Sequence, residues 1–149
     1  ERTGLPVRIL VAAYLLGALL SSCGKAPAGA AMLPGAMVNY AGTFVRNGST
    51  DTSRATGAVA ASYDPNTLTL TYSISWASLT SLPVAMHFHD NGPVIVIITG
   101  FPVATTGTIS GACKLTAAQA TDLGNGGIYA MIHTVSYNSG EIYAPLVRN

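Results

Sequence analysis

Residues 67–76 read TLTLTYSISW, and this stretch decides the fold class. Its even-numbered positions carry large apolar side chains, and its odd-numbered positions carry Thr or Ser. Successive side chains of a β-strand point to opposite faces, so the alternation predicts a strand with one core face and one solvent face. The turn sequence Asp64-Pro65-Asn66 just before it predicts a hairpin with residues 57–63.

Several other segments carry strand patterns. Strands are expected at residues 38–45, 86–90, 93–98, 108–113, 129–134 and 140–147. The sequence Asp90-Asn91-Gly92 supplies the residues of a tight hairpin turn. The Val-Ile run that follows this turn predicts a central strand buried on both faces.

One short helix interrupts the strands. Thr116 and Gln119 fit a capping box at its start, and Gly124 lies where a helix C-cap is expected. About eight strands with one helical segment predict an all-β, antiparallel β-sandwich.

Composition and charge restrict the class of protein. The chain has 149 residues, of which 49% are hydrophobic and 9% are charged, with a formal net charge of +1. These values are typical of one compact domain rather than a disordered chain. The basic residues are scattered singly, so no basic stripe is available for a phosphate backbone, and we expect no nucleic-acid partner.

The N-terminus has the pattern of a targeting segment. Residues 9–20 form an apolar run too short to cross a bilayer as a helix, which takes about 20 residues. The sequence Leu20-Ser21-Ser22-Cys23-Gly24 resembles a bacterial lipobox, which implies lipidation of Cys23 and an address in the cell envelope, periplasmic or at the cell surface. We therefore expect a signal segment at 1–22, with retention as a membrane anchor as the alternative. A flexible tether at 23–35 and a folded domain at 36–149 follow.

The chain contains only two cysteines. If Cys23 carries a lipid, Cys113 has no partner for an intrachain disulfide. A free cysteine in a strand is typically a small buried apolar residue, and this is the role we expect for Cys113.

All three histidines fall in two strand segments. Strand geometry puts His87 and His89 on one face about 6–7 Å apart, and His133 projects from its own segment together with Tyr129 and Met131. The opposite faces are apolar, and they consist of Val84, Met86 and Phe88 in one segment and Ile128, Ala130 and Ile132 in the other. If both apolar faces pack on the core, the three imidazoles meet on the outside of the sandwich.

Three imidazoles beside a thioether favour a soft metal. The predicted ligands are His87, His89 and His133, with Met131 as a fourth, and copper is the expected ion with zinc as the alternative. Strand alternation also places Tyr129, Glu141 and Tyr143 on the outward face, and they are candidates to orient an imidazole. The plainer alternatives are surface or hydrogen-bonded histidines, a methionine that fills a gap, and ordinary surface tyrosines and glutamate.

The ordered set of motifs resembles the CHRD domain over roughly residues 37–146. The residues that carry the resemblance are Tyr63-Asp64-Pro65, the strand at 67–76, Leu79-Thr80, His87-Phe88-His89, Gly92-Pro93-Val94, Leu115-Thr116, Tyr129, His133-Thr134 and Gly140-Glu141-Ile142. The resemblance implies an immunoglobulin-like, β-rich fold displayed outside the cytoplasm, and it implies no defined activity. Met131 stands where the family commonly has Asn, and Tyr143 stands where it commonly has Arg.

The His-x-His strand is also similar to copper/zinc superoxide dismutase, another antiparallel sandwich. A dismutase centre of that type needs about six histidines, and three are present, so we reject it. No Gly-x-Ser-x-Gly elbow and no phosphate-binding glycine loop occur, so an enzyme is the least supported class.

Two hypotheses follow. In the first, a lipid-anchored domain binds one copper ion for storage, transfer or buffering. In the second, the domain is a structural or protein-interaction module, an accessory subunit of a membrane-associated assembly with no metal role.

Overall fold

The computed structural model describes residues 35–149. The predicted signal segment at 1–22, the lipidation site Cys23 and the predicted tether up to residue 34 lie outside the described residues and stay predictions. Among the residues that are described, no helix is long and apolar enough to cross a membrane.

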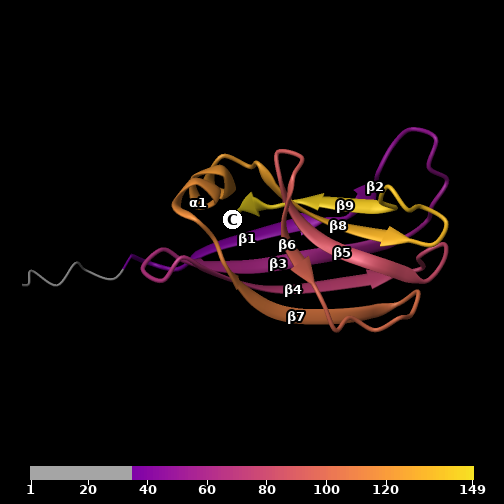
Figure 1. Cartoon of the computed structure of the whole chain (residues 1–149), viewed down its shortest axis with the longest axis horizontal. Coiled ribbons are helices and arrows are strands. Elements are labelled where there is room, and N and C mark those ends of the chain that lie inside the picture. Colours follow the sequence, from indigo (N-terminus) through magenta and orange to yellow (C-terminus); the bar gives the residue numbers. More distant parts are fainter. Residues whose placement is uncertain (1–34) are drawn as a thin grey trace, which may run out of the picture. The chain divides into compact units, whose positions relative to one another are not determined.

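The described residues form two five-stranded sheets packed face to face, with one helix at the left end in Figure 1. The elements are β1 (Val38–Thr43), β2 (Val45–Arg46), β3 (Thr56–Asp64), β4 (Thr69–Ala77), β5 (Pro83–Asp90), β6 (Val94–Ile98), β7 (Gly107–Lys114), α1 (Ala117–Gly124), β8 (Ile128–Thr134), β9 (Ile142–Pro145) and β10 (Val147–Arg148). The first sheet has the order β10-β1-β3-β4-β7, and the second has the order β2-β9-β8-β5-β6. The prediction of an all-β antiparallel sandwich with one short helix is confirmed.

Strand β4 lies between β3 and β7 in the first sheet, and its side chains alternate between the core and solvent as its sequence predicts. Leu70, Tyr72, Ile74 and Trp76 are buried and pack on the second sheet. The predicted hairpin with β3 is also confirmed, because β3 and β4 pair antiparallel along their whole length. Its turn is held by Asp64, whose Oδ1 accepts a hydrogen bond from the Asn66 backbone N–H at 2.9 Å.

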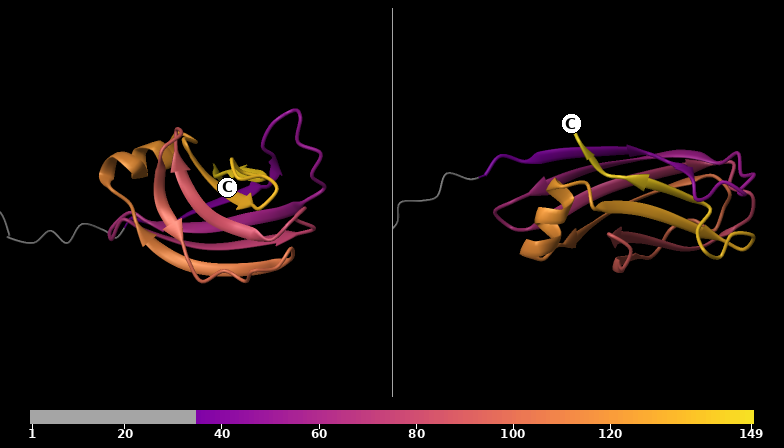
Figure 2. Two further views of the ribbon diagram at one scale, coloured as in Figure 1. Left: turned by 45° about the vertical axis from the view of Figure 1, so that its right-hand side comes forward. Right: turned by 90° about the horizontal axis from the view of Figure 1, so that it is seen from above.

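On one side of the sandwich, two connections each pass from one sheet to the other through a single residue. The chain passes from β1 to β2 at Phe44 and from β9 to β10 at Leu146, and both side chains are buried in the core. The crossings are matched, since β1 pairs with β10 in one sheet and β2 pairs with β9 in the other. Figure 2 shows these crossing strands together along one side of the sandwich. They close that side and leave β6 and β7 as the sheet edges on the other.

Strand β6 corrects one prediction. Residues 93–98 were expected to form a central strand buried on both faces, but β6 is the last strand of its sheet and Ile97 is 70% exposed. Only Ile98, at its end, is fully in the core. An unbroken Val-Ile run has no periodicity that separates a central strand from an apolar edge strand, so the sequence pattern was ambiguous at this point.

Two smaller predictions were also wrong in detail. Val84 was expected in the core and is 49% exposed, because the pairing of β5 with β8 shifts between Pro83 and Ala85 and the bulge breaks the alternation. The helix begins with the predicted capping box of Thr116 and Gln119, but its C-cap is Asn125 rather than Gly124. The left-handed position that ends the helix is taken by Gly126, with φ of 80°.

Candidate metal site

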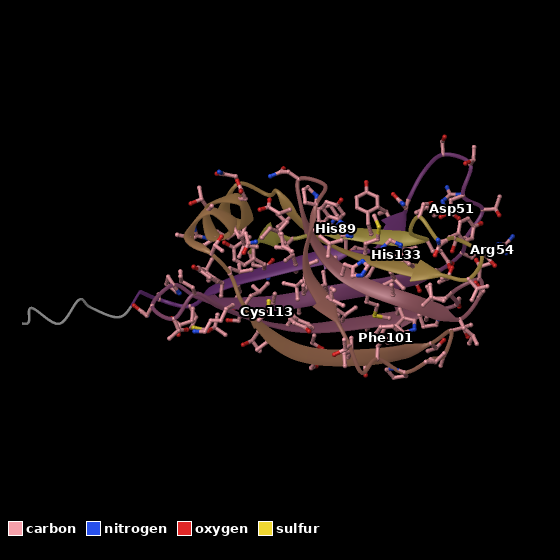
Figure 3. The ribbon with its side chains drawn as sticks, viewed as in Figure 1. Asp51, Arg54, His89, Phe101, Cys113 and His133 are labelled. Atoms are coloured by element: carbon pink, nitrogen blue, oxygen red, sulfur yellow. The ribbon has the colours of Figure 1, made fainter. Side chains whose placement is uncertain are left out.

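The three histidines come together on the outer face of the second sheet. His87 and His89 project from β5, and His133 projects from β8, the antiparallel neighbour of β5. One ring nitrogen of each histidine lies within 4.8 Å of one ring nitrogen of the other two. Figure 3 shows His89 and His133 side by side on the adjacent strands. The predicted convergence of the three imidazoles is thus present in the fold.

Strand register explains the convergence. His87 lies directly opposite Met131, whereas His133 lies opposite Ala85, two residues before His87 on β5. The small side chain of Ala85 leaves the ring of His133 free to lean diagonally towards His87. Nδ1 of His87 and Nε2 of His133 are 3.3 Å apart as a result.

Backbone carbonyls fix the tautomers of two of the rings. Nδ1 of His89 lies 2.8 Å from the Gly92 carbonyl oxygen, and Nδ1 of His133 lies 2.9 Å from the Asn138 carbonyl oxygen. Because a carbonyl only accepts, each Nδ1 carries a proton, and in the neutral ring each Nε2 presents a lone pair. This arrangement, in which the far ring nitrogen donates to a backbone carbonyl, is the usual support of a metal-bound histidine.

The Nε2 atom of His89 is the unusual atom of the cluster. His89 is 8% exposed, and its Nε2 is buried without a hydrogen-bond partner. Leaving a buried acceptor unpaired costs roughly 1–3 kcal/mol, so such atoms are rare in native folds. A lone pair with no donor, in a ring that lies beside two other imidazoles, suits a metal ion.

His87 is held differently. The only hydrogen bond of its ring among the described residues is the one to His133, with Nδ1 as donor, since Nε2 of His133 carries a lone pair. Burial and the nearby His133 and His89 lower the pKa of His87, which favours its neutral, metal-binding form.

Two of the three residues predicted to orient imidazoles lie beside the cluster. The ring of Tyr129 stacks on the ring of His89 at a centroid distance of 4.9 Å and an interplanar angle of 3°. Tyr143 packs edge-on against Tyr129 at 6.0 Å. The stack restricts the rotation of the His89 ring, while a hydrogen-bonding role for either tyrosine stays a prediction.

Met131 lies next to the histidines but is covered by a loop. It faces His87 and Tyr143 across the two neighbouring strands and is only 9% exposed. Its sulfur packs under Gly140, where an added Cβ would come within 2.5 Å of Sδ. A ligand role for Met131 stays a prediction.

Glu141 lies in the interior, and the predicted outward orientation was wrong. It is fully buried, because it precedes the first residue of β9 and strand alternation does not apply to it. Oε1 accepts hydrogen bonds from Ser53 Oγ and, at 2.8 and 2.9 Å, from Thr80 N and Oγ1, and Oε2 accepts one from Thr134 Oγ1 at 2.7 Å. Glu141 therefore joins two loops to β8 next to His133, and none of its hydrogen bonds goes to an imidazole.

Sequence reasoning missed Gly92 and Asn138, which support the cluster through their carbonyl oxygens. A carbonyl is common to every residue, so only the turn sequence around Gly92 gave a signal.

Cys113 lies in β7 of the other sheet, partly buried against the core, and burial raises its pKa. This location agrees with the apolar role expected for it.

The geometry defines the class of protein. It is an all-β sandwich with a cluster of three histidines on one face. The sequence model of the CHRD domain matches residues 38–143, and the chain belongs to the CHRD domain family. No curated protein and no solved structure matches the chain.

Proposed function

We propose that this CHRD domain binds one metal ion through His87, His89 and His133. The observation that carries the proposal is the buried Nε2 of His89, which has no hydrogen-bond partner and belongs to a ring whose centroid lies 5.7 Å from that of His87 and 6.2 Å from that of His133. Two of the rings already have the tautomer that a ligand needs. Binding one ion would satisfy the orphaned nitrogen and replace the contact between His87 and His133.

The donor set favours copper. No carboxylate joins the cluster among the described residues, so a hard cation such as magnesium or calcium has no ligand there. Neutral imidazoles suit copper and zinc, and copper binds most tightly in the divalent series. We therefore name copper as the ion and zinc as the alternative, held for storage, transfer or buffering.

The site belongs, in this proposal, to a protein anchored in the cell envelope. Its support is the lipobox-like sequence around Cys23, preceded by an apolar run at residues 9–20. Mass spectrometry of the chain from a membrane fraction tests it. A diacylglycerol adduct on Cys23 as the mature N-terminus is the expected result, and an unmodified Cys23 in a chain that keeps residues 1–22 would contradict it.

Elemental analysis tests the metal proposal. The full chain is purified without a polyhistidine tag and assayed for bound metals before and after loading with Cu(I). We expect about one copper per chain, lost in the double variant His87→Ala/His89→Ala. A matched control is Tyr143→Phe, which leaves all three imidazoles in place and should keep the copper.

The edge strand β6 gives the alternative function some support. Val94 and Ile97 are exposed on an edge whose backbone is open to pairing, and such an edge is a common docking place for a partner strand. In that case Ile97→Lys should reduce the size of the complex that the chain forms in detergent extracts, measured by sedimentation. If wild type and Ile97→Lys both sediment as monomers with the same coefficient, the result would count against a protein-interaction role.

A further inference from the structure

The position of Met131 bears on what else the proposed metal can bind. We infer that the bound metal keeps one coordination position open to a small external anion, and that Met131 does not fill it. This inference rests on the proposed metal site, and it makes the site one that takes ligands from solution rather than a closed store.

The first observation is the number of donors. The cluster holds three imidazoles, and no Cys, Asp or Glu of residues 35–149 joins it. Asp90 follows His89 in the chain, but its carboxylate is engaged with Asn91 at the turn, where Oδ1 accepts from Asn91 Nδ2 at 2.9 Å. Glu141 directs both oxygens to hydroxyl and backbone donors. The protein therefore supplies three nitrogens, and four-coordinate geometry leaves one position.

The second observation is the environment of the Met131 sulfur. An added Cβ at Gly140 would meet Sδ at 2.5 Å and Asn47 Nδ2 at 2.9 Å. Nδ2 of Asn47 donates to the carbonyl oxygens of Ser139 and Gly140, both at 3.2 Å. The sulfur thus packs under Gly140 of the β8–β9 loop, while Nε2 of His133 lies 3.3 Å from Nδ1 of His87. Met131 acts here as an apolar wall of the site.

The third observation is charge and access. Three neutral imidazoles leave the full charge of the ion uncompensated, because no carboxylate of the described residues lies in the cluster. His87 and His133 are partly exposed, and only His89 is buried, with the ring of Tyr129 stacked on it. An uncompensated cation that is reached from solution on one side favours a small anion, such as hydroxide or azide, at its open position.

Azide is the probe for the open position. The full chain is loaded with Cu(II) alone, its copper content is measured, and azide is then titrated while the absorption spectrum is recorded. Azide replaces a bound water without any change of oxidation state. We expect a new charge-transfer band that saturates at about one azide per copper.

The variant Met131→Leu removes the thioether at similar volume, and Met86→Leu, in the core on the inner face of β5, is the matched control. Both variants should leave the dissociation constant of azide within about twofold of wild type. One copper per chain with no azide band overturns the inference. Azide binding that is about tenfold tighter in Met131→Leu than in wild type and Met86→Leu also overturns it. A chain that holds no copper before azide is added overturns the proposed function itself. The wild-type titration decides the question if Met131→Leu does not fold.

Discussion

At the scale of single residues, two buried polar groups set the character of this domain in opposite ways. The carboxylate of Glu141 is fully buried and accepts four hydrogen bonds, so its burial is compensated. Nε2 of His89 is buried and accepts none. The first group holds the loops of the fold together, and the second is left available for a ligand.

Replacement of Glu141 by Gln should destabilise the domain substantially. The amide nitrogen cannot accept, so it leaves one or two of the Ser53, Thr80 and Thr134 donors unpaired in the interior. We expect a loss of about 2–4 kcal/mol in the free energy of unfolding, measured by urea denaturation. Tyr143→Phe, two residues further along the chain in β9, should change this free energy by less than about 0.5 kcal/mol. A similarly small effect of Glu141→Gln would show that the carboxylate does not organise the loops.

At the scale of elements, the turn between β5 and β6 links the backbone to the site. Gly92 has φ of +124° in this turn, and its carbonyl oxygen accepts the hydrogen bond from His89. Few side chains adopt such a backbone conformation, so the turn requires glycine at this position. The hairpin thus fixes both the direction of the chain and the tautomer of one predicted ligand.

The substitution Gly92→Ala should cost about 1 kcal/mol or more in stability and weaken copper binding, because it strains the turn that holds His89. Gly124→Ala is the matched control, since Gly124 ends α1 with open space around it and no left-handed φ. That control should be neutral or stabilising by up to about 1 kcal/mol. Thermal unfolding and a copper competition titration measure both effects. Equal behaviour of the two variants would contradict the role given to the turn.

The edge position of β6 makes a second prediction at this scale. Ile97 is 70% exposed and its neighbour Ile98 is 2% exposed. Truncation of Ile97 to Ala should therefore cost less than about 0.5 kcal/mol, and truncation of Ile98 should cost about 2–4 kcal/mol. Denaturant unfolding of Ile97→Ala and Ile98→Ala measures both losses in the free energy of unfolding. Comparable losses would mean that β6 is covered on both faces, as the Val-Ile run alone suggests.

The same elements show what could be predicted from the sequence. The alternation of β4 and the two short turns are local signals, so the hairpins could be predicted. The outward direction of His87, His89 and His133 could be predicted from the alternation of their own segments, and their convergence followed on the condition that both apolar faces pack on the core. The edge position of β6 and the burial of Glu141 depend on pairing and on loops distant in the chain. The exposure of Val84 depends on a bulge. No local pattern encodes these features, because tertiary packing decides them.

At the scale of the whole molecule, the site couples stability to pH. The pKa of His87 is lowered in the folded chain, so folding favours its neutral form. The stability that this contributes is present above the unfolded pKa of about 6.5 and is lost as the pH falls through the lowered folded pKa. We expect the metal-free chain to lose stability below about pH 6.5 more steeply than His87→Gln. Thermal melts of both chains between about pH 7.5 and 5 measure the difference, and parallel curves would contradict a His87 that the fold keeps neutral.

The central claim is that three imidazoles of one CHRD domain hold one metal ion. X-ray absorption spectroscopy of the copper-loaded full chain reads the ligands directly. We predict a first shell of nitrogen at about 2.0 Å, with the outer scattering of about three imidazoles and no sulfur. A copper–sulfur contribution would contradict the account. A first shell without imidazole scattering would also contradict it, and the histidines would then be ordinary surface residues.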